Sequence, residues 1–109
     1  MLLREISLLP GTDHQLIGPL LEDICRREGL GLALKTVLRE YPGSMHWHWK
    51  RGKENGTLEV THLPSENRLW ISVHENRAAP WTDPVAARLA SKMEEKLRSE
   101  VDTVFSEFE

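Results

Sequence analysis

The chain has 109 residues, of which 39% are hydrophobic and 28% are charged, and this balance is ordinary for one globular domain. Its net charge of −3 argues against a general nucleic-acid binder, and no apolar run approaches the roughly 18 residues that span a bilayer. The start Leu2-Leu3-Arg4-Glu5 meets charge too early for a signal peptide, and a lone Cys25 cannot form an internal disulfide. We therefore expect one domain over residues 1–109, located in the cytoplasm.

The first thirty residues predict a short edge strand and then a helix. Residues 2–9 mix Leu, Ile and charge without clear periodicity, which favours an edge strand over a helical turn. Apolar residues recur at helical spacing over residues 16–25, and Gly29 supplies a stop. Pro19 either opens this helix or kinks it. Cys25 belongs to the apolar pattern and is interpreted as a small buried hydrophobe rather than a nucleophile.

The next 45 residues read as four strands in an antiparallel meander. Three turn signals separate the strands, namely Pro42-Gly43, Asn55-Gly56 and Pro64-Ser65-Glu66-Asn67. A type II turn at Pro42-Gly43 would pair Leu38 with Trp47 and Thr36 with Trp49. Because side chains alternate along a strand, these turns assign every strand residue to one of two faces.

One face is expected to be the core and the other to be wet. The core face collects Leu34, Leu38, Trp47, Trp49, Leu58, Val60, His62, Leu69, Ile71 and Val73. The polar face collects Lys35, Val37, Arg39, His46, His48, Glu59, Thr61, Trp70, Ser72 and His74. Core packing is the preferred interpretation of Trp47 and Trp49 over a stacking platform for bases or sugars, and His62 is interpreted as a satisfied core histidine.

A long amphipathic helix follows from Asp83-Pro84, with one apolar stripe that ends at Phe105 and Phe108. Its roughly 25 residues span about 37 Å, whereas an eight-residue strand spans about 27 Å, so the helix end should overhang the sheet. The predicted fold class is α+β: an N-terminal helix, a four-stranded antiparallel meander and a long C-terminal helix, with both helices on the Trp47/Trp49 face.

The pattern His46-Trp47-His48 places two imidazoles on the polar face, with Glu59 as the expected cross-strand neighbour. Two nitrogens and a carboxylate form a recognised ligand set for zinc or non-haem iron. The alternative is a pair of histidines on a solvated face with no metal. His74 lies one strand further away and would join only if the sheet curls strongly.

Trp70 is the main candidate for recognition, because a large apolar ring has no structural need on a polar face. The stems of Lys35 or Arg39, or the N-terminal segment, would otherwise cover it. Arg77 lies in the crossover to the long helix, at a mouth where a ligand could enter. Trp70, Phe105 and Phe108 are the candidate residues of a dimer interface.

Three functions follow. The first is a non-enzymatic protein-binding or adaptor module that forms a homodimer and uses the Trp70 face or the overhanging helix. The second is a small metal-dependent enzyme or ligand binder that uses His46, His48 and Glu59. The third is a single-stranded nucleic-acid binder that uses the mildly basic sheet region.

Overall fold

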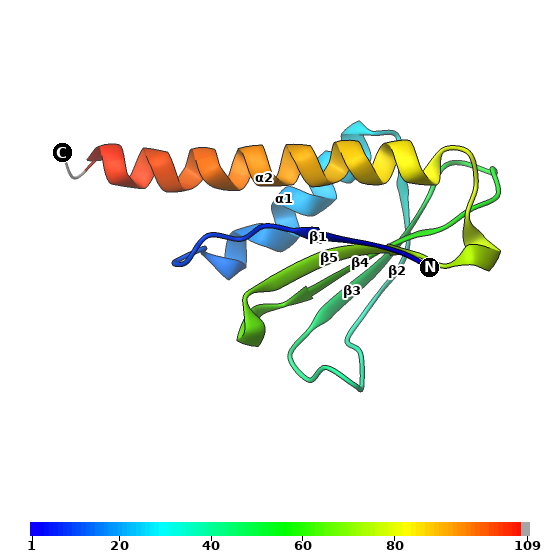
Figure 1. Ribbon diagram of the computed structural model, residues 1–109, viewed down its shortest axis with the longest axis horizontal. Helices are drawn as coiled ribbons and strands as arrows, with labels where there is room; N and C mark the ends of the chain where they lie inside the picture. Colours follow the sequence, from blue (N-terminus) through cyan, green and yellow to red (C-terminus); the bar gives the residue numbers. More distant parts are fainter. Residues whose placement is uncertain (108–109) are drawn as a thin grey trace.

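The computed structural model describes residues 1–107, with side chains up to residue 99, and consists of two layers (Figure 1). One layer is an antiparallel sheet, and both helices lie on the same face of it. The strands are β1 (Leu2–Ile6), β2 (Gly31–Thr36), β3 (Met45–Lys50), β4 (Leu58–Leu63) and β5 (Arg68–Val73); the helices are α1 (His14–Arg27) and α2 (Thr82–Glu107). The α+β class and the two helices on one face are as predicted.

The sheet has five strands in the order β1-β5-β4-β3-β2, rather than the four of the predicted meander. The meander itself is confirmed, since β2 to β5 follow one another as antiparallel neighbours. The fifth strand is the N-terminal segment, which pairs with β5 from Leu2↔Val73 to Ile6↔Leu69. A segment with mixed apolar and charged residues suits this position, because an edge strand is paired along only one side.

Helix α1 begins after Asp13, whose side chain accepts a hydrogen bond from the backbone N–H of Gln15 at 3.0 Å. Pro19 lies inside this helix rather than opening it. The helix ends at Arg27, two residues before Gly29, whose φ of +81° suits glycine, and Leu30 N–H donates back to the carbonyl of Cys25 at 3.0 Å. Gly29 stops the helix just after its last residue, as predicted.

The hydrophobic core lies between the sheet and the two helices, and the Trp47/Trp49 face is the core face, as predicted. Trp47 and Trp49 are 1% and 0% exposed. In register, Trp47 pairs with Val60, and Val60 pairs with Ile71. The helices contribute apolar stripes to the same cluster: Ile17, Leu21, Ile24 and Cys25 from α1, and Val85, Leu89, Met93 and Leu97 from α2. Alternation along β3 therefore leaves His46 and His48 on the opposite face.

The predicted register of β2 is wrong. Lys35, not Leu38, is the partner of Trp47, and Leu34 lies opposite His48. The turn at Pro42-Gly43 does form, with Ser44 N–H donating to the carbonyl of Tyr41 at 3.0 Å, but the ladder resumes only at Thr36↔His46. Residues 37–44 form a longer loop than the predicted turn. As a result, Leu34, Lys35 and Thr36 lie on the faces opposite to those predicted.

The reversal moves Lys35 to the helix face. There its Nζ donates to Glu22 of α1 at 2.7 Å, and Trp47 Nε1 donates to the same carboxylate at 3.1 Å. Leu34 correspondingly lies on the polar side and is 43% exposed. The register shifts between Leu32 and Leu34. At the start of β2, Leu32 therefore pairs with the core residue Trp49.

The β3–β4 loop packs against the crossover between β5 and α2. Trp81 Nε1 donates to the carbonyl of Asn55 at 2.7 Å. Gly56 has a φ of +108°, and a Cβ at this position would lie 2.7 Å from the Cβ of Ala79. The glycine predicted for the turn is therefore required for this close approach as well.

The C-terminal end of α2 extends past the sheet (Figure 1). Phe105 lies in this helix but its side chain is outside the described part, and Phe108 is outside the described residues. Among the residues that the structure describes, neither helix is long and apolar enough to cross a membrane.

Candidate functional site

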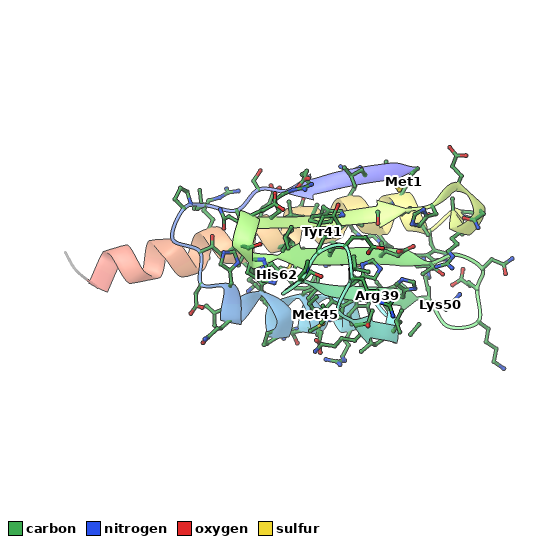
Figure 2. All side chains as sticks on the ribbon, turned by 90° about the horizontal axis from the view of Figure 1, so that it is seen from below. Met1, Arg39, Tyr41, Met45, Lys50 and His62 are labelled. Carbon is green, nitrogen blue, oxygen red and sulfur yellow. The ribbon has the colours of Figure 1, made fainter. Side chains whose placement is uncertain are left out.

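The polar face of the sheet, which is the face opposite the helices, is far more buried than an open sheet face. His46 and Glu59 are 7% and 5% exposed, and Thr61 is 1% exposed. Figure 2 looks onto this side and shows the loop of residues 37–44, with Arg39 and Tyr41, lying across the sheet. Apart from the aromatic Tyr41 before Pro42, nothing in the sequence pattern predicted that a loop would cover this face.

Cross-strand pairing brings the predicted metal ligands together. His48 pairs with Glu59 and His46 pairs with Thr61 in the β3–β4 ladder, so the expected neighbour of the histidine pair is confirmed. His46 Nε2 lies 3.0 Å from His48 Nε2 and 3.1 Å from Glu59 Oε1. His48 Nε2 lies 3.3 Å from the same carboxylate oxygen. Three potential ligand atoms therefore converge on one point.

The spacing of these atoms matches that of metal ligands. Donor atoms bound at about 2.0–2.1 Å to a tetrahedral or octahedral ion lie roughly 2.9–3.4 Å from one another. Without an ion, the same distances are hydrogen bonds in which an imidazole N–H donates to the carboxylate or to the other ring. The geometry thus supports a closed hydrogen-bonded cluster or a cation held by the same three side chains, here called the His-His-Glu cluster.

A further contact fixes the orientation of His46. Its Nδ1 lies 2.8 Å from Thr61 Oγ1, which is buried in the middle of β4. An imidazole whose Nδ1 is engaged by a second residue keeps its Nε2 directed at the ligand position, as histidine ligands of metals commonly do. Thr61 was assigned to the polar face by the sequence, but its role as the partner of His46 emerges only from the structure.

The surroundings of His48 favour the neutral form of its imidazole. Burial lowers the pKa of His48 from its ordinary value of 6.5, and the neighbouring Glu59 carboxylate partly opposes this shift. His46, Arg77 and His74 lower the pKa of His48 further, because positive charge on these neighbours disfavours another positive charge. A neutral imidazole has a lone pair available for a cation.

The second oxygen of Glu59 connects the cluster to two further predicted residues. Glu59 Oε2 lies 3.2 Å from His74 Nε2 and 3.6 Å from Arg77 Nη1. Neither contact has hydrogen-bond geometry, so this buried oxygen has no hydrogen-bond partner within the described chain. His74 therefore reaches Glu59, an approach that the sequence made conditional on a strongly curled sheet, but it is not one of the three side chains of the His-His-Glu cluster.

A shallow groove opens beside the cluster. Its volume is about 390 Å³, and it is lined by His48, Glu59, His74, Asn76 and Arg77. A wider groove continues over the β3–β4 loop past Lys50 and Lys53. Four of the predicted site residues therefore face solvent-accessible space that a small molecule can enter.

Trp70 lies on the polar face, as predicted, but its ring is only 7% exposed. Tyr41 packs against it edge-on at 5.8 Å between ring centroids, and the Arg68 guanidinium stacks over it at 4.3 Å. Arg68 is in turn paired with Glu5 of β1. The expectation that this ring stands open for recognition is therefore not met in the structure, and Trp70 does not line the groove.

Two other predicted residues have structural roles. Burial raises the pKa of the Cys25 thiol, which fits its interpretation as a buried hydrophobe. His62 is buried on the core face and satisfied by His14 at the start of α1: His14 Nδ1 lies 2.8 Å from His62 Nε2, and the rings are stacked. Trp47 and Trp49, which a stacking platform would need, are buried.

Comparison with known proteins adds no family to this picture. The chain matches no protein-family model, and neither the curated proteins nor the solved structures contain a match to it. The function must therefore be argued from the site.

Proposed function

We propose that this protein binds a divalent transition metal, zinc or ferrous iron, at the His-His-Glu cluster and uses it to bind or transform a small ligand. The observation that carries the proposal is the convergence of His46 Nε2, His48 Nε2 and Glu59 Oε1 at 3.0–3.3 Å from one another. Zinc and ferrous iron both accept two imidazoles and a carboxylate.

Three protein ligands leave part of the coordination sphere of either metal open. Catalytic zinc sites and non-haem iron sites share this feature, whereas structural zinc sites take four protein ligands. The groove along His48 and Glu59 gives a ligand access to that open side. The arrangement therefore favours a metal that acts on a ligand over a metal that only stabilises the fold.

Metal uptake tests the proposal. We expect purified protein to bind about one equivalent of zinc or ferrous iron and to melt at a higher temperature when loaded. His48→Ala and Glu59→Gln should each abolish stoichiometric uptake. His14→Ala is the matched control, because it removes an imidazole that packs on the opposite face of the sheet.

Equilibrium dialysis followed by elemental analysis, with parallel thermal melts, provides the measurement. Uptake should weaken as the pH falls, because protons compete with the metal for the imidazoles. Wild-type protein that takes up neither metal, nor nickel or manganese, and shows no thermal shift with any of them would overturn the proposal.

Self-association as a binding module is the second candidate function. The outer edge of β2 pairs with no other strand in the described chain, and all of its residues are exposed. Leu32 and Leu34 place apolar side chains along this strand at 41% and 43% exposure, and Val37, the first residue after it, is 54% exposed. Two β2 edges related by two-fold symmetry could pair into one continuous sheet.

Light scattering tests this candidate. A dimer should have twice the 12.5 kDa mass of one chain, and Leu34→Lys should convert it to a monomer by adding charge to the shared edge. Lys96→Ala, on the outer surface of α2, is the control. A mass near 12.5 kDa that does not change with concentration would exclude the dimer.

A further inference from the structure

We infer that the groove beside the His-His-Glu cluster binds a small ligand through an oxyanion group, a carboxylate or a phosphate, with Arg77 as the main anchor. This inference rests on the proposed metal site and adds the chemical class of its ligand. The evidence is the charge of the groove, the loose pairing of Arg77 with Glu59 at 3.6 Å and the rigid attachment of the groove walls.

The groove carries an excess of positive charge. Lys50, Lys53 and Arg77 line it, and within the described residues no ion pair involves Lys50 or Lys53. The carboxylate of Glu54, on the same wall, is already paired with Arg51 at 3.0 Å. A concave surface with unpaired cations attracts anions and raises their local concentration.

Arg77 is available for such a ligand. Its side chain is 46% exposed, and its nearest carboxylate oxygen, Glu59 Oε2, lies 3.6 Å away without hydrogen-bond geometry. The guanidinium therefore retains donors for a second oxyanion. Arginine binds carboxylate and phosphate groups through two parallel N–H donors, which is why it suits this class of ligand.

Metal binding would strengthen the demand for an anion. A divalent ion brings two positive charges to a site that holds one carboxylate, Glu59, and Arg77 contributes a third positive charge 3.6 Å from that carboxylate. One negative charge cannot balance three positive ones in a site whose carboxylate is 5% exposed. An oxyanion bound by Arg77 would reduce this excess, by one negative charge for a carboxylate and by about two for a phosphate.

The groove walls are held in place before any ligand binds. Arg77 N–H donates to the carbonyl of His74, and the carbonyl of Arg77 accepts from the N–H of Thr57, both at 2.9 Å. Trp81 ties the β3–β4 loop to the same crossover through Asn55. A preformed site loses little conformational entropy when its ligand binds. Its volume of about 810 Å³ in the wider part admits a ligand larger than a bare inorganic ion.

The test uses phenyl phosphate and benzoate as probes, which share a ring and differ in the oxyanion. Isothermal titration at fixed ionic strength compares the zinc-loaded forms of wild type, Arg77→Ala, Arg77→Lys and Arg27→Ala. Arg27→Ala is the control for the loss of one positive charge, because Arg27 lies on α1, away from the groove. Zinc uptake is measured first for every variant, in the absence of either probe, and thermal melts confirm that each variant is folded.

We expect at least one probe to bind zinc-loaded wild type and Arg27→Ala equally, and to bind Arg77→Ala about 10- to 100-fold more weakly. Arg77→Lys should recover only part of the loss, because lysine keeps the charge without the paired donors. The stronger probe then identifies the oxyanion as phosphate or carboxylate. Zinc uptake with no binding of either probe, or with equal binding to Arg77→Ala, overturns this inference and leaves the metal site standing. If wild type takes up ferrous iron but not zinc, the same titrations are made with the iron-loaded protein. Absence of uptake of zinc, ferrous iron, nickel and manganese overturns the metal proposal, and this inference with it.

Discussion

Replacing Trp47 by alanine should lower the free energy of unfolding by about 3–5 kcal/mol, a large part of the stability of a domain of this size. The ring is 1% exposed and lies at the centre of the core between β2 and β4. Its loss would leave a cavity beneath α1 and would also remove the hydrogen bond from Trp47 Nε1 to Glu22. Far-UV circular dichroism during chemical denaturation gives the measurement.

His46→Ala is the matched comparison, because it is the adjacent residue on the opposite face of the same strand. It removes hydrogen bonds to Thr61 and Glu59 but creates no large apolar cavity. We therefore expect a loss of about 1–3 kcal/mol in metal-free protein, smaller than that of Trp47→Ala. The reverse order of denaturation midpoints would contradict the assignment of the two faces.

Acidification should remove about 3 kcal/mol of stability through His62 by pH 4. Burial, with a smaller contribution from the neighbouring His14, lowers the pKa of His62 from 6.5 to about 4. The folded state therefore keeps this imidazole neutral, whereas the unfolded chain protonates it below about pH 6.5. Its contribution to stability is complete above pH 6.5 and is lost progressively as the pH falls towards 4.

The pH dependence of the unfolding free energy for wild type and His62→Gln isolates this contribution from that of other acid-titrating groups. Glutamine cannot titrate, so the variant should show a flatter profile between pH 6.5 and 4, whatever its stability at pH 7. His14→Ala should flatten the profile only slightly, since burial is the larger cause. Parallel profiles for wild type and His62→Gln would show that His62 does not cause the acid sensitivity.

The structure changes the basis of the self-association hypothesis. The sequence argued for a dimer from an exposed Trp70 and from the helix end with Phe105 and Phe108. Tyr41 and Arg68 cover Trp70, and the side chains of the two phenylalanines lie outside the described part. The exposed edge of β2 is now the surface that supports self-association, and the light-scattering experiment addresses it directly.

The alternation of side chains along β3, β4 and β5 was predictable from the sequence, because it depends only on the two-residue period of a strand and on short turns. That period placed Trp47 in the core and His46 and His48 on the polar face. It also placed Glu59 on the same face as the histidines, because the possible turns at Asn55-Gly56 all leave the same residues of β3 and β4 on that face. The long helix and its start near Asp83-Pro84 follow equally from local capping and periodicity.

Tertiary packing alone decided the register of β2. A Pro-Gly turn specifies its own four residues but not the point at which pairing resumes, and that point is set by contacts with distant groups. Lys35 reaches Glu22 of α1 only in the observed register, and residues 37–44 are then long enough to lay Tyr41 over Trp70. The burial of the polar face follows from that loop.

The same distinction applies to the candidate site. His46, His48 and Glu59 lie on neighbouring strands, so strand alternation and one hairpin were enough to predict that these three candidate ligands would be neighbours. The approach of His74 and Arg77 to Glu59 Oε2 depends on how the sheet curls and on where the β5–α2 crossover is tied to Thr57. For β3, β4 and β5 the sequence therefore determined which side chains share a face. The three-dimensional packing determined the faces of β2 and which side chains touch, because side-chain direction is a local property and sheet curvature and loop closure are not.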